Sequence, residues 1–247
     1  MKNTQIIILA AGHGKRMQSE LPKALTPLLG KPFIRHVLST VKKSGICDKP
    51  IIVIGQKGDQ VRGVLGDGHL YAIQDKQLGT GHAVMMAEKL SHGKENVLIL
   101  YADHPMVSAQ TIKNLAKTHC QDEAIITMAT AAVKDFKGWR KDFLTFGRFV
   151  RDANGQIEKI IEIKDASEKE KKIKEVNPAY MCFKASWMWG HLKKLQNKNA
   201  QGEYYLTDLI KMAFDEKEKI SSIKIEDKEA LGVNSQEELK RLEKIIR

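Results

Sequence analysis

The sequence lacks any hydrophobic run long enough to cross a membrane. No stretch approaches the roughly 20 apolar residues that a membrane-spanning helix needs. The N-terminus has no signal-peptide pattern either, because Lys2 leads directly into an apolar segment. We therefore expect a cytoplasmic protein with no membrane partner. Internal repeats and low-complexity segments are also missing, which argues against a repeat architecture and a long flexible linker.

Cysteine is scarce and widely spaced. The three cysteines are Cys47, Cys120 and Cys182, and no Cys-x-x-Cys pair occurs. Such spacing is typical of reduced thiols in a protein core, and it argues against a cysteine-based metal site.

Acidic residues are fewer than basic ones. The chain has 30 Asp and Glu against 41 Lys and Arg, a formal net charge of +11, which favours anionic partners. The lysines are scattered with few aromatic residues between them, and no helix-turn-helix, zinc-finger or RNA-binding motif is present. A nucleic-acid partner is therefore unlikely. Solvated surface lysine is the default interpretation, and a substrate with several phosphates is the next.

Apolar runs alternate with helical patterns through the first half of the chain. This order predicts right-handed βαβ units and a mostly parallel sheet. Ligands of such sheets bind beyond the carboxyl ends of the strands. The first, third and fourth runs end at a glycine-rich loop, at Gln74 and at Asp103, so we expect these three sites to open at one edge. The five expected strands cover 6–9, 50–55, 69–73, 96–101 and 124–132.

The alternation of strand and helix patterns ends after about residue 133. Segments 146–151 and 157–163 flank Asp-Ala-Asn-Gly, and Asn-Gly suits a hairpin turn with positive φ. Helical patterns follow at 203–214 and at 235–246, the latter with Ser235 and Glu238 in capping-box spacing.

The first apolar run leads into small residues and two cations. Gly12 and Gly14 lack a Cβ, so backbone N–H groups there can approach a bound anion closely. Arg16 and Lys23 follow within the same loop. Gly-x-Gly alone also occurs in many ordinary tight turns, and this loop is neither a Walker A motif nor a dinucleotide fingerprint.

Two further segments contain residues suited to binding a base or a metal ion. Gln74 offers both a donor and acceptors to the edge of a base, and Gly79-Thr80-Gly81 starts a helix with free N–H groups, although ordinary helix starts look similar. Asp103 follows a strand, and a carboxylate beside a triphosphate suits Mg²⁺, although a lone Asp there is more often a solvated or capping residue.

The whole chain resembles the sugar-nucleotide pyrophosphorylases, a family of nucleotidyltransferases. Leu-Ala-Ala-Gly-x-Gly-x-Arg-Met followed by Pro-Lys is similar to their signature loop. Gln-Asp-Lys-Gln-Leu-Gly-Thr-Gly-His-Ala at 74–83 closely resembles the uracil-binding segment of bacterial N-acetylglucosamine-1-phosphate uridyltransferases. The string at 199–208 and Gly-Val-Asn at 232–234 also resemble the family in the expected order.

The resemblance implies the role of individual residues. Arg16, Lys23 and Asp103 would be the catalytic residues. Asp103 and Asn234 would bind Mg²⁺. The sugar would contact Tyr101, Ala102, Gly147, Glu162 and Asn177. The nucleotide would contact Leu9, Ala10, Ala11, Gly12, Gly14, Gln74, Gly79 and Thr80.

The resemblance also implies a fold and a reaction. The fold would be Rossmann-like α/β, a mixed and mostly parallel sheet with helices on both faces and a β-hairpin insertion on the sugar side. We expect one nucleotidyltransferase domain over 1–247, with a nucleotide-binding half (1–132), a sugar-binding half (133–247) and no left-handed β-helix domain. The reaction would join UTP and N-acetylglucosamine 1-phosphate into UDP-N-acetylglucosamine and pyrophosphate, in a monomer or homodimer.

Two departures from the family pattern leave alternatives open. Ala102 stands where the family has glycine, and Pro178-Ala179 replaces Thr-Gly. These changes favour the same chemistry on another sugar phosphate or nucleotide as the nearest alternative. A non-catalytic nucleotide-binding regulatory protein is the alternative from a different class.

Overall fold

A computed structural model describes residues 3–246 except 13 and 18. The strands of the large sheet are β1 (Thr4–Leu9), β4 (Ile51–Ile54), β5 (Leu70–Ile73), β6 (Asn96–Tyr101), β7 (Ile126–Ala132), β8 (Arg148–Arg151), β9 (Ile157–Ile161), β10 (Glu175–Val176), β11 (Met181–Lys184) and β12 (Ile220–Lys224). A small hairpin pairs β2 (Pro27–Leu28) with β3 (Lys31–Pro32).

Seven α-helices connect these strands within the described residues: α1 (Phe33–Ser44), α2 (Gly58–Leu65), α3 (Thr80–Met85), α4 (Ala109–Asp122), α5 (Ala185–Leu192), α6 (Asp208–Asp215) and α7 (Gln236–Ile246). Short 3-10 turns occupy Lys15–Met17, Lys23–Leu25, Lys89–Ser91, Gly138–Thr145, Glu170–Lys172 and Asp227–Ala230. Among the described residues, no helix has the length and apolarity to span a bilayer.

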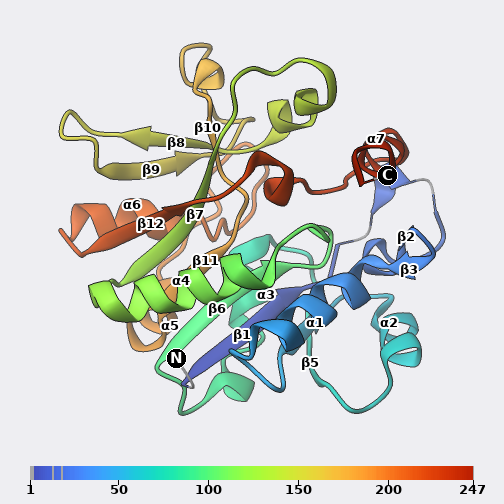
Figure 1. The fold of residues 1–247 in the computed structure, drawn as a ribbon. Helices are drawn as coiled ribbons and strands as arrows, with labels where there is room; N and C mark the ends of the chain where they lie inside the picture. Colours follow the sequence, from blue (N-terminus) through green and yellow to red (C-terminus); the bar gives the residue numbers. More distant parts are fainter. Residues whose placement is uncertain (1–2, 13, 18, 247) are drawn as a thin grey trace.

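The large sheet has the order β5-β4-β1-β6-β11-β7-β10-β8-β9, and β12 pairs with β7 (Figure 1). Strands β5, β4, β1 and β6 are parallel to their neighbours, as predicted. Strand β11 runs antiparallel between β6 and β7, so β7 and its parallel neighbour β12 point the same way as β6. The predicted mixed, mostly parallel α/β sheet is confirmed.

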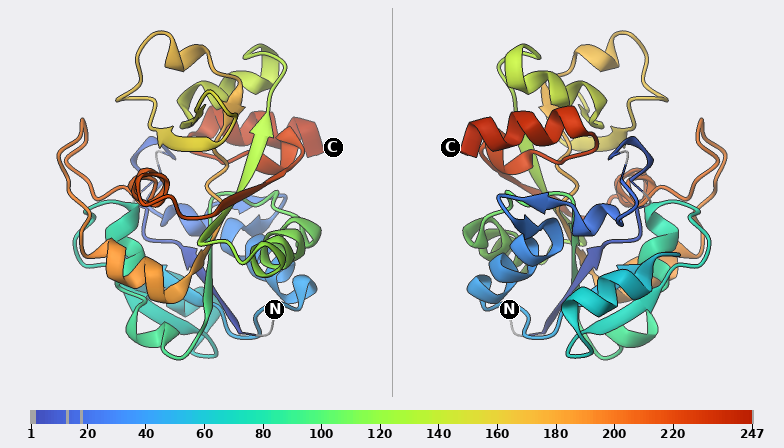
Figure 2. Two further views of the ribbon diagram at one scale, coloured as in Figure 1. Left: turned by 90° about the vertical axis from the view of Figure 1, so that its left-hand side faces the viewer. Right: turned by 90° about the vertical axis from the view of Figure 1, so that its right-hand side faces the viewer.

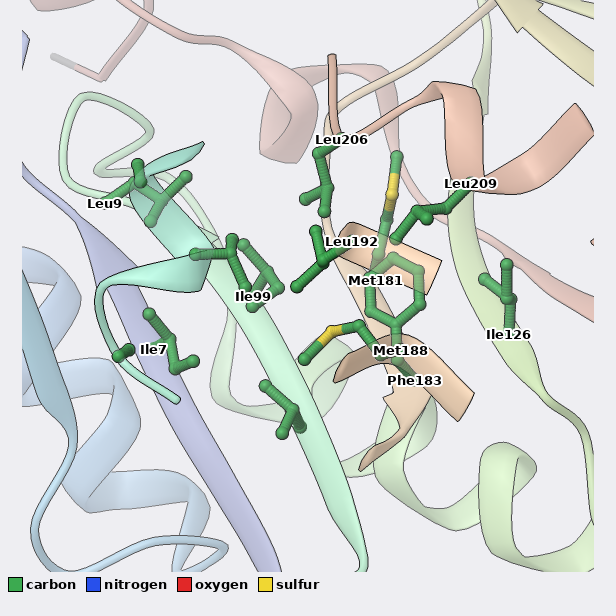
Figure 3. Packing of buried hydrophobic residues seen from close by; sticks show 14 of the residues in the cluster. Ile7, Leu9, Ile99, Ile126, Met181, Phe183, Met188, Leu192, Leu206 and Leu209 are labelled. Carbon is green, nitrogen blue, oxygen red and sulfur yellow. The ribbon is translucent and has the colours of Figure 1, made fainter. Parts of the chain in front are cut away.

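Helices cover both faces of this sheet because its central strands are buried on both sides. Ile7 and Leu9 of β1 and Ile99 of β6 point to one face, where residues of α3, α5 and α6 pack against them (Figure 3). Ile6 and Ile8 of β1 point to the other face, against α1 and α4. Alternation of side chains along a strand sends successive residues to opposite faces.

The hairpin after β7 extends the sheet beyond β10, whereas β11 and β12 return to pair with β7. Strands β8 and β9 make the predicted hairpin, and Gly155 in its turn has φ +78°. Figure 2 shows this hairpin, the following loops and α7 gathered at one end of the molecule, away from β1, α2 and α3. The hairpin buries Phe149, Ile157 and Ile160 in the same cluster as residues of α6. A third hydrophobic cluster, which includes Phe143, Val176 and Leu239, contains residues of α7 instead.

The helix predicted at 203–214 is wrong at its start, because α6 begins only at Asp208. The preceding residues use their backbone groups on a neighbouring loop instead. Tyr204 donates its N–H to Leu78 and accepts from the N–H of Gly81, both at 2.8 Å. Tertiary hydrogen bonds thus replace the helical ones that the local pattern favoured.

Candidate functional site

A cavity of about 200 Å³ opens at the carboxyl ends of β1, β5 and β6, where the sequence predicted one shared edge. We call it the glycine-loop cavity. Its walls contain Leu9, Ala10, Ala11, Gly12, Lys23, Ala24, Gln74, Gln77, Gly79, Thr80, Ala83, Tyr101, Ala102, Asp103 and Glu203.

The glycine loop packs closely against Gly55 and against Lys23. A Cβ added at Gly55, after β4, would lie 2.7 Å from the carbonyl oxygen of Ala11. Gly14 has φ +63°, and a Cβ there would lie 3.0 Å from the Cβ of Lys23. Glycine at 14 therefore lets the loop lie against the stem of Lys23 in a backbone conformation that other residues rarely adopt.

The predicted base segment forms the opposite wall of the glycine-loop cavity. The buried side chain of Gln74 donates from Nε2 to the carbonyl of Gly79 at 3.1 Å and lies 3.1 Å from Nδ1 of His82. Gly79 has φ +102°, and a Cβ there would lie 2.7 Å from the carbonyl oxygen of Tyr204. The segment is thus fixed by the loop that precedes α6.

Three predicted residues meet at the edge of this cavity. The Lys23 ammonium forms an ion pair with Oδ2 of Asp103 and donates to Oδ1 of Asn234 at 2.7 Å. The Lys23 and Asp103 side chains are only 12% and 19% exposed. Burial disfavours the Asp103 carboxylate, but the Lys23 ammonium, with a smaller effect of His104, outweighs it and lowers the pKa of Asp103.

The donor atoms of this cluster suit a divalent metal ion. A carboxylate and an amide oxygen are hard oxygen ligands, and the Lys23 ammonium that both contact shows that the pair can hold a cation. No group of three or more His, Cys, Asp or Glu side chains arranged to hold a metal occurs in the described part of the chain. Mg²⁺ needs no such group, because it keeps several waters and takes further ligands from substrate phosphates.

His104 packs behind the cluster, although no sequence motif singles this residue out. Its ring is buried and lies 5.8 Å from the ring of Tyr101 and 5.6 Å from that of Tyr180. A Cβ at Gly232 would collide with this ring, and the N–H of Val233 donates to the carbonyl of Asp103 at 2.9 Å. Glycine at 232 therefore lets Asn234 approach Asp103.

A second, larger hollow of about 590 Å³ adjoins the first, with Thr80 and Tyr101 in the walls of both. We call it the Glu162 cavity. Its walls contain Arg16, Thr80, Tyr101, His104, Thr145, Phe146, Gly147, Glu162, Ile163, Lys164, Asn177, Ala179, Gln201, Thr207 and Asn234.

Polar side chains dominate the Glu162 cavity. Oε1 of Glu162 accepts from the Thr207 hydroxyl at 3.1 Å. Burial raises the pKa of Glu162, and nearby Asp208 and Asp165 raise it further against the effect of Thr207. Burial likewise raises the pKa of Tyr101, with added effects of Glu162 and Asp103.

The predicted Asn177 is held in a turn rather than left free. Its Oδ1 accepts from the N–H of Ala179 at 2.8 Å, and its own N–H donates to the carbonyl of Gly147 at 3.0 Å. Ala179 has φ +67°, a left-handed conformation that non-glycine residues rarely adopt. The Pro178-Ala179 departure therefore lies in the wall of the Glu162 cavity and carries backbone strain.

The structure places the predicted site residues in the walls of the two cavities, except Gly14, which lines neither. Arg16 is exposed and lines the Glu162 cavity, whereas Lys23 lines the glycine-loop cavity. Ala102, predicted beside the sugar, is buried and lines the glycine-loop cavity only. Gly147 and Asn234 line the Glu162 cavity.

Sequence reasoning missed three side chains at the site. Gln77 lines the glycine-loop cavity and donates from Nε2 to the carbonyl of Ala11, which ties the base segment to the glycine loop. Glu203 lines the same cavity. Arg148 is fully buried, donates to the carbonyls of Phe143 and Phe146, and so fixes the strand next to Gly147.

The chain is similar to known proteins over most of its length. Residues 6–211 match the model of the MobA-like NTP transferase domain. The bifunctional protein GlmU of Acetivibrio thermocellus is 40% identical over 249 residues, covering 100% of this chain and 52% of the relative. GlmU of Geobacillus sp. (strain WCH70) is 42% identical over 243 residues, covering 98% of this chain and 51% of the relative. The chain thus spans about half the length of the curated relatives it matches.

Solved structures agree on the fold. A putative glucose-1-phosphate thymidylyltransferase from Bacillus anthracis, in complex with a sucrose, matches with a TM-score of 0.76 at 21% identity, over 99% of this chain and 95% of the other. A UDP-glucose pyrophosphorylase complexed with UDP-glucose matches with a TM-score of 0.75 at 17% identity, over 98% of both chains. The predicted resemblance is confirmed, and the chain belongs to the family of MobA-like NTP transferase domains.

Proposed function

We propose that this chain is a uridyltransferase that makes UDP-N-acetylglucosamine and pyrophosphate from UTP and N-acetylglucosamine 1-phosphate. The observation that carries the proposal is the cluster of Lys23, Asp103 and Asn234 where two adjoining cavities meet. One cavity is built like a nucleotide site and the other like a sugar site, so the two substrates would meet at this cluster. Similarity to GlmU proteins over the whole chain supports the same assignment.

The glycine-loop cavity would take UTP. Oε1 of Gln74 would accept from the edge of uracil, since Nε2 already donates to Gly79 and lies 3.1 Å from Nδ1 of His82. Gly12 and Gly14 let backbone N–H groups approach the triphosphate. The carbonyl of Ala11 is engaged by Gln77, so the loop and the base segment would hold the nucleotide as one unit.

The reaction is an in-line displacement at the α-phosphorus. An oxygen of the sugar 1-phosphate forms the new bond to this phosphorus, and the bond to the β-phosphate oxygen breaks to release pyrophosphate. A phosphate is already an anionic nucleophile, so no protein base or covalent intermediate is needed. Catalysis then consists of positioning and of neutralising charge with Arg16 and Lys23.

Asp103 and Asn234 would hold Mg²⁺. When bound, this ion would stabilise the negative charge that develops on the phosphates. The protein's contribution is to keep the two oxygen donors together, which the bond from Val233 to Asp103 and the turn before α7 achieve.

The Glu162 cavity would take the sugar. Glu162 can accept from sugar hydroxyl or amide groups, and Gly147 leaves space because a Cβ there would lie 3.6 Å from Oε1 of Glu162. Asn177 would contribute its remaining amide hydrogens, since its oxygen is already used within the turn.

Pyrophosphate release with Mg²⁺ and UTP across a panel of sugar 1-phosphates tests the proposal. We expect the fastest release with N-acetylglucosamine 1-phosphate and UTP, and little with other nucleoside triphosphates. Absence of release with every sugar, together with measurable UTP binding, would contradict the enzymatic role and favour a regulatory one.

A second candidate is the same chemistry on another sugar 1-phosphate. The strained Ala179 in the wall of the Glu162 cavity favours it, because its methyl group and the preceding proline alter the shape of that wall. Release with a different sugar in the same panel would keep the chemistry and move the specificity to this turn.

A further inference from the structure

Lys23 contacts both of the oxygen atoms that would bind a metal ion. Its ammonium pairs with Oδ2 of Asp103 and donates to Oδ1 of Asn234. Its stem lies against the glycine loop, since a Cβ at Gly14 would be 3.0 Å from its Cβ and one at Gly12 would be 4.0 Å from its Cδ. The same loop that would grip the nucleotide phosphates therefore covers the stem of this lysine.

From these contacts we infer that Lys23 and the divalent metal ion exchange at Asp103 and Asn234, and that the triphosphate of the nucleotide drives the exchange. The inference rests on the proposed function. In this mechanism Lys23 neutralises Asp103 before substrate arrives. Metal and nucleotide then bind cooperatively, because the phosphates supply a new anionic partner for the released ammonium.

The two cations cannot occupy this position together. The ammonium uses the same carboxylate and amide oxygens that the metal ion would need. Two positive charges at contact distance repel each other, and a divalent ion repels the ammonium more strongly than a monovalent one. Metal binding without nucleotide must therefore first displace Lys23 from its partners.

Lys23 can move while its partners stay in place. A lysine ammonium sits on a flexible four-carbon stem, so it can turn toward phosphates without a change in the backbone. Asp103 and Asn234 are fixed independently, because the N–H of Val233 donates to the carbonyl of Asp103 and the N–H of Asn234 donates to Oε2 of Glu238 at 2.5 Å. The two oxygens would therefore remain together after the exchange.

Linkage makes the effect reciprocal. If nucleotide raises the metal affinity by some factor, metal must raise the nucleotide affinity by the same factor. Removal of the Lys23 charge should strengthen metal binding in the absence of nucleotide and weaken this coupling. A lysine that served only to bind phosphate would have no effect on metal binding to the free protein.

Mn²⁺ titration followed by electron paramagnetic resonance tests the inference on the full chain without turnover. We expect Lys23→Met to bind Mn²⁺ about tenfold more tightly than the wild type in the absence of nucleotide. A non-hydrolysable UTP analogue should raise Mn²⁺ affinity strongly in the wild type and little in the variant. Unchanged or weaker Mn²⁺ binding by Lys23→Met would overturn the inference.

Arg16→Met is the matched control. It removes one positive charge from the same loop, but Arg16 is exposed and makes no ion pair with Asp103 among the contacts of the described residues. Its Mn²⁺ affinity without nucleotide should stay near the wild-type value. An equal gain in both variants would show a general charge effect and also overturn the inference.

Two further variants make the result unambiguous. Asp103→Asn combined with Lys23→Met should lose the gain in Mn²⁺ affinity, which locates the ion at this pair. Lys23→Gln, with a circular dichroism melt, serves if Lys23→Met does not fold. If the wild type releases pyrophosphate but Lys23→Met binds Mn²⁺ no more tightly, only this inference is contradicted. If Lys23→Met binds Mn²⁺ more tightly but the wild type releases no pyrophosphate, only the proposed function is contradicted.

Discussion

The glycine-loop cavity and the Glu162 cavity adjoin each other but are built from different parts of the chain. Small residues and backbone at the ends of β1, β5 and β6 make up most of the glycine-loop cavity. The Glu162 cavity takes its walls from side chains of segments that range from residue 16 to residue 234. Alanine and glycine thus make up about half of the residues of one cavity, whereas larger polar residues make up most of the other.

This difference affects how each cavity can change. Added atoms have no space at the start of α3, since a Cβ at Gly79 would lie 2.7 Å from the carbonyl oxygen of Tyr204 and one at Gly81 would lie 2.6 Å from Cδ1 of Leu195. In the Glu162 cavity a strained alanine is accommodated at position 179. We therefore expect nucleotide choice to depend on backbone geometry and sugar choice on single side chains.

The largest expected effect comes from the residue at the junction of the two cavities. Asp103→Asn removes the charge that Lys23 faces and that a metal ion would need. We expect turnover to fall by about 10²–10³-fold, the usual cost of losing one electrostatic contact to a transition state. UTP binding, measured by calorimetry, should change much less.

Asp135→Asn is the control for this experiment. It breaks the comparable ion pair with Arg140, at 2.8 Å, outside both cavities. It should leave turnover within about twofold of the wild type, as surface ion pairs contribute little. Retained turnover in Asp103→Asn would mean that the two cavities do not act as one site.

Gly79→Ala tests the backbone character of the glycine-loop cavity. A Cβ at residue 79 would lie 2.7 Å from the carbonyl oxygen of Tyr204, and φ there is +102°. With ψ at 176°, this backbone conformation is open essentially to glycine alone and costs another residue about 1–3 kcal/mol, and the collision should add about 1–3 kcal/mol. Urea unfolding and UTP titration should both show the loss.

Gly93→Ala separates strain from collision. Gly93 has φ +79°, but an added Cβ would have no heavy atom within 4 Å. It should lose only the backbone part of the stability and none of the UTP affinity. Equal losses in both variants would mean that side-chain space at Gly79 does not matter.

The glycine-loop cavity was also the easier one to predict from the sequence. Gln74 follows directly after β5 and Asp103 lies two residues after the end of β6, and parallel strands bring their carboxyl ends to one edge. Local patterns therefore sufficed to place them together. The contact from Gln77 to Ala11 was not predictable, because these residues are 66 positions apart and only the packed loops reveal it.

The Glu162 cavity required tertiary information. Resemblance alone singled out Glu162 and Asn177, since taken singly each looks like an ordinary polar surface residue. The burial of Arg148 against backbone carbonyls leaves no local sequence pattern. The helix predicted at 203–214 began too early for the same reason, as Tyr204 bonds to a distant loop.

Glu162→Gln tests the side-chain character of the Glu162 cavity. Glutamine keeps an oxygen for the Thr207 hydroxyl but removes the negative charge. We expect KM for the sugar phosphate to rise about tenfold, since charge-assisted hydrogen bonds are roughly twice as strong as neutral ones. KM for UTP should stay constant in steady-state assays. Glu158→Gln, on the same hairpin outside the cavity, should change neither value.

The smallest expected effect is a pH dependence of stability on the Glu162 side of the molecule. Asp208 starts α6, and burial, with a smaller effect of Asp165, raises the pKa of Asp208 from 3.8 to about 6. Asp208 should therefore lower the stability of the folded protein as pH rises from 3.8 to about 6, because the folded state binds this proton more tightly than the unfolded state. Above about 6 the loss is complete.

Asp208→Asn removes this titration, since an amide stays neutral. The pKa difference corresponds to about 3 kcal/mol, and solvent screening of this partly buried carboxylate should reduce the gain of the variant to about 1 kcal/mol at about pH 7. Below about pH 4 the variant should gain nothing, as measured by urea unfolding. Asp59→Asn is the matched control, because Asp59 also lies in the first turn of a helix but is exposed. Its difference from the wild type should not vary in this window. A pH-independent gain in Asp208→Asn would mean that the clustered carboxylates near Glu162 carry no electrostatic cost, and the contrast between the two cavities would then rest on shape alone.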